Sequence, residues 1–242
     1  ATDFDGDALT CSWEQFNRGA ELSSRYDMID YGSRPLFRAW QPVKHSERYF
    51  PRLEDVVDGT LVVGETYPNT DRTLAMRLVV RDGAGGIDTD TTNVRVVDSA
   101  GPFKVESPHG ITRLSGFDAL TVKWDVARTN RSPIACQHVD IMLSNDAGRT
   151  FAHTLLSETD NTGTANVYFM PNFNVRQGKL MVKCSDNIFF SVALADIYIT
   201  RVDNSAKPQV TATMPLEMAE EQSLLIQLSN VTVTDADSDH FT

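Results

Sequence analysis

Alternating aspartates in two similar motifs are the residues best suited to chemistry in this sequence. The motif TDFDGDALT (2–10) is echoed by TDADSDHFT (234–242). Carboxylates two residues apart on a tight turn converge on one point and offer the oxygen ligands that calcium prefers. The spacing therefore predicts calcium at both motifs, and the alternative is an acidic turn with solvated carboxylates. The aspartates concerned are Asp3, Asp5, Asp7, Asp235, Asp237 and Asp239.

The residues after the first motif indicate what kind of calcium site it would be. Glu14 stands twelfth from Asp3, as the last ligand of an EF-hand would, but residues 9–13 have the alternation of a β-strand. Because an EF-hand needs a helix on each side of its loop, calcium at a strand–loop or domain junction is the better prediction. A further acidic group, RDGAGGIDTD, flanks a glycine-rich hairpin turn. There a structural turn is expected first, with a cation at Asp82 and Asp88 as the alternative.

The stretch SNDAGRTF (144–151) matches the pattern S-x-D-x-G-x-T-[WF], which resembles the Asp box of sialidases and other propeller proteins. In those families the box is a hairpin turn that the aspartate holds by hydrogen bonds and the aromatic residue anchors in the core. A sialidase carries several boxes, and this chain has one. The resemblance thus implies a structural turn, not catalysis, for Ser144, Asp146, Gly148 and Phe151.

Signatures of catalysis are otherwise scarce. The five histidines form no HExxH pair, and the sequence contains no G-x-S-x-G and no glycine-rich phosphate loop. A carboxylate pair of the glycoside-hydrolase kind stays open, because any acidic β-protein contains candidate pairs. We predict from these observations that the chain is not an enzyme.

Three cysteines bear on the compartment of the protein. Cys136 and Cys184 each lie in an alternating apolar segment, and a disulfide between them would join two strands of one sandwich. Closing a loop of about 48 residues stabilises a fold by about 3–4 kcal/mol on the loop-entropy scaling. In an oxidising compartment this disulfide is favoured over two buried free thiols. Cys11 would remain unpaired as a small buried hydrophobic residue.

The composition restricts the partners. The 242 residues include 33 acidic and 22 basic side chains, a net charge of −11, which repels nucleic acid and anionic lipid. No apolar run approaches the length of a membrane span. The chain starts with a polar Ala-Thr-Asp, so we expect any export signal to lie upstream or to have been removed.

Short alternating segments rich in β-branched and aromatic residues dominate the chain, and long helical periodicity is nearly absent. This pattern predicts an all-β protein made of tandem Ig-like or cadherin-like β-sandwiches. The expected strands are 9–13, 73–80, 92–97, 120–126, 138–144, 166–169, 179–184, 197–202 and 224–228, and the expected helical turns are 52–57 and 218–222.

Two Pro-containing breaks after strands, VVDSAGPFKV and ITRVDNSAKPQV, predict domain boundaries. They divide the chain into segments 1–98, 99–202 and 203–242. Only the middle segment has a full sandwich's set of strands, so the first and last are expected to be incomplete within the chain. The long connection 16–72 is too aromatic for a linker, and we expect it to pack over a sandwich face.

The order of several phrases resembles the non-catalytic region of secreted bacterial reprolysin-type zinc metallopeptidases, over residues 1–202. The phrases are TDFDGDALTCSWEQ, PLFRAWQP, RYFPRLEDVV, RTLAMRLVVRDGAGG, AGPFKVESP, LTVKWDVARTN, SPIACQHVDIMLSNDAGRTF and VKCSDNIFFSV. The resemblance implies a PKD- or cadherin-like sandwich followed by an Ig-like one, in a protein secreted by bacteria or held at their surface. Residues 203–242 resemble the opening strands of a bacterial cadherin-like repeat. Cadherin-type repeats hold calcium between domains, which implies calcium at the aspartates of both motifs.

Three functions follow as hypotheses. The first is an extracellular structural or adhesive module stiffened by calcium. The second is an accessory region that positions substrate for the catalytic domain of a secreted zinc metallopeptidase. The third is carbohydrate binding by the aromatic connection, including Tyr31, Trp40 and Phe50, which requires exposed rings.

The echo of the two motifs allows a more specific form of the first hypothesis. Segment 1–98 lacks the strands that normally precede such a motif, and segment 203–242 contains two plausible strands that end at one. The last segment of one copy would then complete the first segment of the next by strand addition. Such a head-to-tail contact need not close and would build a filament. The alternative is an excerpt of a longer chain, in which these segments contact neighbouring domains.

Overall fold

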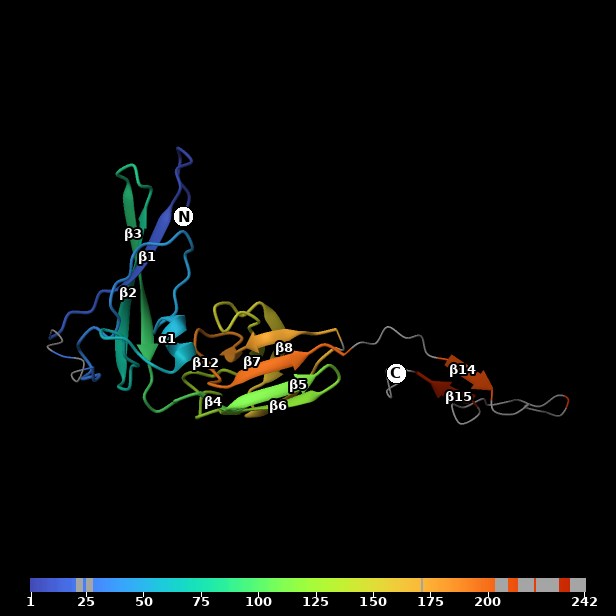
Figure 1. Cartoon of the computed structure of the whole chain (residues 1–242). Coiled ribbons are helices and arrows are strands. Elements are labelled where there is room, and N and C mark those ends of the chain that lie inside the picture. The colour runs from blue at the N-terminus through green and yellow to red at the C-terminus, as the bar shows by residue number, and fades with distance from the viewer. Residues whose placement is uncertain are drawn as a thin grey trace.

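The computed structural model (Figure 1) describes residues 1–20, 24, 28–170, 172–202, 209–212, 220 and 231–235. Within these residues the regular structure is almost entirely β-strand, and α1 (Leu53–Asp58) is the single α-helix. None of the described helical residues forms a segment long and apolar enough to cross a membrane. The protein is thus all-β with Ig-like sandwich architecture, as the alternation of its short segments predicts.

The first group of strands forms a three-stranded antiparallel sheet in the order β1-β2-β3, here called the head sheet. Its strands are β1 (Thr10–Gln15), β2 (Arg72–Arg81) and β3 (Ile87–Val96). Alternation along β2 directs Leu74 and Met76 to one face, where they pack with Leu36 and Phe37 of the long connection. This small core covers the half of the sheet that lies nearer the start of β2.

The connection between β1 and β2 is ordered by short backbone pairings. Val43 pairs with Cys11 of β1, and Phe37 pairs with Glu65. The helix α1 begins after Arg52 and ends at Gly59, whose φ of 70° is the left-handed conformation typical of a glycine beyond a helix end. The prediction that this aromatic segment packs instead of forming a floppy linker agrees with these pairings.

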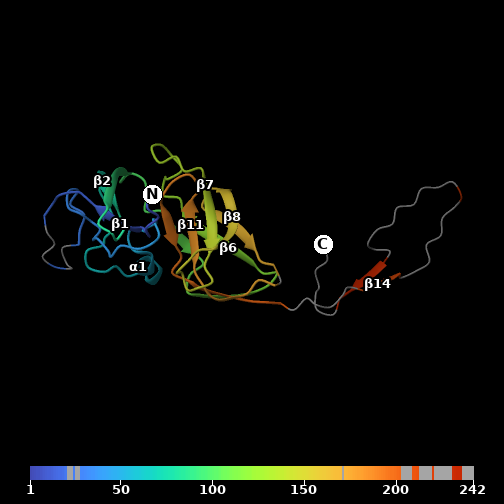
Figure 2. The same cartoon turned by 90° about the horizontal axis from the view of Figure 1, so that it is seen from above.

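The second group, β4 to β13, forms two facing layers and is here called the Ig-like domain (Figures 1 and 2). One layer has the order β4-β6-β9; the other contains β12-β11-β7-β8 and β10-β13-β5, in which β13 and β5 run parallel. The bounds are β4 (Lys104–Ser107), β5 (Ile111–Ser115), β6 (Ala119–Asp125), β7 (His138–Leu143), β8 (His153–Asp160), β9 (Thr164–Tyr168), β10 (Val175–Gly178), β11 (Leu180–Cys184), β12 (Phe190–Val192) and β13 (Asp196–Thr200).

The core of the Ig-like domain lies between these layers. Val122 of β6 faces the opposite layer, where Val139 and Ile141 of β7 and Val182 of β11 are likewise 0% exposed. Trp124 joins the same cluster and donates from Nε1 to Asn161 Oδ1 at 2.8 Å. The alternation of buried and exposed residues along β6 and β7 is the period-2 pattern from which the strands are predicted.

The third group is a two-stranded antiparallel sheet, here called the tail hairpin. It consists of β14 (Gln209–Ala212) and β15 (Val231–Thr234). The strand expected at 224–228 lies outside the described residues, as does the helical turn expected at 218–222 apart from Glu220.

Five strands of the Ig-like domain are absent from the expected set, namely β4, β5, β8, β10 and β12. The register of β8 against β7 shifts twice, and Glu158 has a φ of 50°, so adjacent Leu155 and Leu156 break the alternation. The strands β10 and β12 have 4 and 3 residues, too few to show a period. The predicted helical turn at 52–57 is observed one residue later, as α1.

Candidate functional site

The first aspartate motif forms a local turn. Asp3 Oδ1 accepts hydrogen bonds from the backbone N–H of Asp5 at 2.9 Å and of Asp7 at 3.0 Å, and Gly6 has a φ of 82°. Asp5 and Asp7 are exposed. One oxygen of Asp3 thus already serves the turn, and the described part of the chain nowhere gathers three or more His, Cys, Asp or Glu side chains at metal-binding range. Calcium at this motif stays a prediction.

The second motif is described only at its start. Asp235 follows β15 directly, whereas Asp237 and Asp239 lie outside the described residues. The order strand–motif in the tail and motif–strand in the head is nevertheless fixed by β15 and β1.

At the β2–β3 turn one carboxylate of the acidic group holds the backbone of the turn. Asp82 Oδ1 accepts the backbone N–H groups of Ala84, Gly85 and Gly86 at 2.7–3.0 Å. Asp88 Oδ1 accepts the backbone N–H of the next residue at 2.8 Å. Both carboxylates therefore make local contacts in the turn and its first strand residues, and a cation between them stays untested.

The Asp-box residues form a hydrogen-bonded turn between β7 and β8. Ser144 Oγ donates to Asp146 Oδ1 at 2.6 Å and accepts the backbone N–H of Gly148 at 2.7 Å. Asp146 also accepts from the backbone N–H and the hydroxyl of Thr150. Partial burial opposes ionisation of Asp146, but the hydrogen bonds from Ser144 and Thr150 outweigh it and lower its pKa from 3.8 to about 2. The carboxylate is therefore an ionised structural acceptor near neutral pH.

This turn also contacts the helix α1. Phe151 packs in a cluster with Leu53 and Val57 of α1 and with Met181 and Val192 of the Ig-like domain, here called the junction. Gly148 lies under the same helix, because a Cβ built on it would come within 2.7 Å of Val57 Cγ1. The Asp-box turn is thus a packing surface for the preceding part of the chain.

An aromatic pair and a second glycine extend the junction. The Tyr49 and Phe190 rings meet edge to face with centroids 5.2 Å apart. Gly59, just after α1, lies so near Leu194 that a Cβ would be 3.0 Å from it. Contacts on both sides of α1 therefore join the long connection to the Ig-like domain.

Two buried carboxylates organise the long connection, and the sequence gives no spacing signal for either. Glu65 is 0% exposed and accepts hydrogen bonds from Trp40 Nε1, Arg48 Nη2 and the backbone N–H of Arg52, each at 2.7 Å. Since all these donors lie in the connection, Glu65 folds it around one point. The only hint in the sequence is that an unusually aromatic connection also contains several arginines.

Asp30 ties the connection to the head sheet. Its side chain is 0% exposed and pairs with Arg72 Nη1 of β2 at 2.6 Å. Burial opposes ionisation, but hydrogen bonds from the backbone N–H groups of Gly32 and Asn69, from the Thr70 hydroxyl and from Arg72 lower its pKa from 3.8 to about 2. The ionised carboxylate thus joins two segments about 40 residues apart, its own turn at Gly32 and the residues from Asn69 to Arg72.

The rings that suggest carbohydrate binding have mixed positions. Phe37 is buried and packs on Phe50, and Trp40 lies between the guanidinium groups of Arg38 and Arg52 at 4.8 and 4.6 Å from its ring centre. Tyr31 is 64% exposed. Most of these rings therefore serve packing within the connection.

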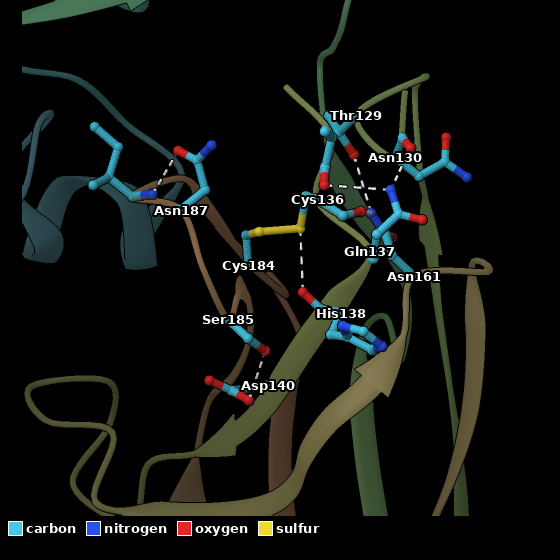
Figure 3. Close-up of a disulfide and its surroundings, with 12 residues drawn as sticks. Thr129, Asn130, Cys136, Gln137, His138, Asp140, Asn161, Cys184, Ser185 and Asn187 are labelled. Carbon is cyan, nitrogen blue, oxygen red and sulfur yellow. Dashed lines mark hydrogen bonds between the residues drawn. A yellow bond between two sulfur atoms is a disulfide. The ribbon is translucent and has the colours of Figure 1, made fainter. Parts of the chain in front are cut away.

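A disulfide joins Cys136, just before β7, to Cys184 at the end of β11 (Figure 3). The two Cα atoms are 6.2 Å apart and the sequence separation is 48 residues. Both cysteines are buried, and β7 and β11 are neighbours in one layer. Cys11 is a buried free thiol.

A polar recess of about 350 Å³ lies beside this disulfide. Figure 3 shows Asn130, Gln137, His138 and Asn161 close to one another there. Asn161 is buried, and its Nδ2 donates two hydrogen bonds, one to Thr129 Oγ1 and one to the Cys136 carbonyl. The full lining is Asn130, Gln137, His138, Asp160, Asn161 and Thr162.

Comparisons with known proteins identify no family. No family model matches the chain, and no curated protein matches it. Solved structures with similar arrangements include a chimeric titin Z1Z2 tandem, at 10% identity, a TM-score of 0.28 and coverage of 57% of this chain and 68% of that one. Tandem Ig repeats of Dlar are similar at 9% identity, a TM-score of 0.33 and coverage of 81% and 84%. The I-band fragment I67–I69 of titin follows, at 10% identity, a TM-score of 0.22 and coverage of 90% and 71%.

Proposed function

We propose that this chain is a non-catalytic extracellular module that holds its neighbours at a fixed spacing, as a structural or adhesive protein requires. The observation that carries the proposal is the junction. Leu53 and Val57 of α1 are buried against Phe151, Met181 and Val192 of the Ig-like domain. A buried apolar contact of this kind resists movement of the long connection relative to the Ig-like domain better than a polar linker does.

The disulfide supports the location outside the cytosol, because disulfides persist in oxidising compartments. We infer the segment division 1–98, 99–202 and 203–242 from the Pro-containing breaks that follow β3 and β13. The PKD- or cadherin-like subtype of the first segment and a bacterial, secreted parent protein are part of this proposal and rest on the resemblance alone.

Calcium binding at Asp3, Asp5 and Asp7 belongs to the same proposal. The fit is partial: Asp5 and Asp7 are exposed, whereas one oxygen of Asp3 accepts two backbone hydrogen bonds. The second oxygen of Asp3 and the other two carboxylates are the groups that would hold the ion. Calcium there would neutralise part of the net charge of −11 and stiffen the turn before β1.

The junction can be tested by measuring the distance between spin labels in the full chain, one on the head sheet at Thr91→Cys and one on the Ig-like domain at Asn166→Cys. We expect a narrow distance distribution that becomes broad in Val57→Asp, because a charge cannot stay in the apolar cluster. Val63→Asp is the matched control, since Val63 belongs to the same connection but is 45% exposed. A distribution already broad in the unsubstituted chain would refute the rigid module.

The polar recess supports a second candidate function, that of a carbohydrate-binding accessory region such as a secreted metallopeptidase would carry. Gln137, His138 and Asp160 line a recess of about 350 Å³ with amide, imidazole and carboxylate groups, and such groups orient small polar ligands. Titration with a panel of monosaccharides, followed by amide chemical shifts, should then perturb these residues. Shifts that are absent at millimolar sugar would remove this candidate.

A further inference from the structure

The head sheet resembles three neighbouring strands in one layer of the Ig-like domain. In both, a strand from earlier in the chain pairs with a central strand, which continues through a turn into the third: β1-β2-β3 corresponds to β7-β11-β12. All neighbouring strands in both sets are antiparallel. The head sheet therefore has the strand order and directions of three neighbouring strands in one layer of the complete domain, although the connection with α1 stands where the domain has β8, β9 and β10.

The two layers differ in what covers them. In the Ig-like domain the layer β4-β6-β9 lies over β7 and β11, so that Val139, Ile141 and Val182 are 0% exposed. On the head sheet Leu78 and Val80 share a face with Leu74 and Met76 but are less completely buried than those two residues, and they belong to no core cluster of the described residues. Figure 1 shows this end of β2 and β3 standing clear of the Ig-like domain. On this face Trp13 and Cys11 of β1 flank Leu78 and Val80, and Cys11 is itself buried. The Leu78–Val80 end of the sheet thus carries apolar side chains that are only partly covered, without a facing layer among the described strands.

The outer edge of β3 is a second candidate for contact with another chain. Within the described part of the chain the strand pairs with β2 alone, and its residues from Ile87 to Asn93 are exposed. An open strand edge invites pairing with another chain.

The tail hairpin has the properties of the absent layer. Its register alternates two apolar pairs, Val210–Val233 and Ala212–Val231, with two polar pairs, the pattern of a hairpin with one apolar face. Val210 is 67% exposed. Because an isolated two-stranded hairpin is marginally stable in water, this hairpin needs a partner for its apolar face.

The aspartate motifs say where such a hairpin belongs. β15 ends at Thr234, the first residue of one motif, and β1 begins at Thr10, the last residue of the other. Superposing the motifs makes β15 the strand that comes just before β1. In the Ig-like domain the strand before β7 is β6, which pairs with β4 in the facing layer. By this correspondence β14 and β15 take the places of β4 and β6, opposite the head sheet.

We propose that the tail hairpin of one copy packs on the open face of the head sheet of a second copy, with Val210 and Val233 over Leu78 and Val80. This inference rests on the proposed structural function and names its partner, another copy of the same chain. The partner is a second copy because the head sheet and the tail hairpin lie on opposite sides of the Ig-like domain in both views (Figures 1 and 2). The eight residues 201–208 limit the distance between the end of β13 and the start of β14 to about 30 Å, even when they are fully extended.

The charges of the two surfaces are compatible. In the head sheet Leu78 and Val80 stand beside Asp90 and Asp88 of β3 in the register, whereas β14 and β15 contain no charged residue. The two strands of the hairpin therefore bring no charge of their own to this acidic rim, and the like charges of the contact are confined to the motifs that follow β15 and precede β1. The contact joins different surfaces of the two copies, so it repeats without closing and builds a linear polymer.

The decisive experiment uses two full-length variants, each with one surface disabled. Val210→Asp/Val233→Asp disables the hairpin face, and Leu78→Asp/Val80→Asp disables the head-sheet face. We expect light scattering to show assemblies of many copies for the unsubstituted chain and the mass of one chain for each variant alone. An equimolar mixture of the two variants keeps one intact hairpin and one intact face, so its mass should double and stop there.

Matched controls place the same charges elsewhere. Gln209→Asp/Thr232→Asp alters exposed residues of the polar pairs in the hairpin, and Thr89→Asp/Thr91→Asp alters the opposite face of the head sheet; both should assemble as the unsubstituted chain does. An unsubstituted chain that keeps the mass of one copy at millimolar concentration would overturn the proposal, whatever the variants do. A mixture that stays at the mass of one copy while both variants keep the thermal transition of the Ig-like domain would do the same. Neither result affects the spin-label distances, which test the rigid module separately.

Discussion

Gly148 of the Asp-box turn and Val57 of α1 touch so closely that a Cβ on Gly148 would lie 2.7 Å from Val57 Cγ1. Gly148 also has a φ of 87°, a conformation that strains any other residue. Glycine is therefore required here for two separate reasons, the backbone conformation and the approach of the helix.

Gly148→Ala should consequently loosen the junction as well as strain the turn. We expect a loss of about 1–3 kcal/mol in the free energy of unfolding, measured by urea denaturation. Gly110→Ala separates the two causes, because Gly110 has a φ of 69° but no atom within 4 Å of the added Cβ. Equal losses in the two variants would mean that the contact with Val57 contributes nothing.

The carboxylate of Asp30 predicts a defined acid sensitivity. Its pKa is lowered from 3.8 to about 2 in the folded chain, so it stabilises the fold above pH 4 and this contribution disappears as the pH falls from about 4 to 2. The shift corresponds to roughly 2 kcal/mol. Asp30→Asn should lower stability at pH 7 and flatten the decline of stability between pH 4 and 2, as followed by urea denaturation at each pH.

Asp146→Asn provides the comparison for this experiment. The pKa of Asp146 is also lowered to about 2, but its hydrogen-bond donors, Ser144 and Thr150, belong to one local turn. Asp30 fastens residues as distant as Gly32 and Arg72. A pH profile unchanged by Asp30→Asn would show that the buried pair does not contribute to acid sensitivity.

The disulfide between Cys136 and Cys184 should contribute about 3–4 kcal/mol to the stability of the Ig-like domain, given its 48-residue separation. Reductant should therefore lower the melting temperature of the unsubstituted chain. Cys136→Ser/Cys184→Ser should melt at the lower temperature with or without reductant. Cys11→Ser, which removes the buried free thiol, keeps the response to reductant. A melting temperature indifferent to reductant in the unsubstituted chain contradicts this prediction.

Calcium should raise the melting temperature of the chain if Asp3, Asp5 and Asp7 bind it, since a ligand of the folded state stabilises that state. We expect no increase in Asp3→Asn/Asp5→Asn/Asp7→Asn. In the unsubstituted chain the melting temperature should return to its calcium-free value on chelation. An equal change of charge at three exposed acids elsewhere, in Asp58→Asn/Glu106→Gln/Asp186→Asn, should leave the increase intact. Loss of the effect in both variants would point to the net charge and not to a site.

The alternating segments made the β architecture and most of its strands predictable, because a strand with one buried face has a period of two that the sequence preserves. β6 and β7 are clear examples, with buried residues at every second position. The strand β8 was not predictable, because its two shifts of register against β7 destroy that period. The hydrogen bonds of the Asp box follow a local pattern of four residues, which explains why a turn could be expected there.

Tertiary contacts without a local pattern remained invisible in the sequence. Glu65 gathers donors from Trp40, Arg48 and Arg52, whose spacing follows no period because the connection that carries them is irregular. The docking of α1 on Gly148 was equally hidden, since it depends on a close approach of two segments far apart in the chain.

The parallel pairing of β5 with β13 determines how the Ig-like domain responds to tension. Five register pairs run from Ile111–Asp196 to Ser115–Thr200. Once β4 has separated from β6, a pull along the chain acts on β5 through Ile111 and on β13 through Thr200, at opposite ends of that ladder. The hydrogen bonds are then loaded in shear and must yield together, not one after another as in an unzipping hairpin. Once they yield, the disulfide keeps the loop between Cys136 and Cys184 from extending, so that a stretched domain lengthens by only part of its contour.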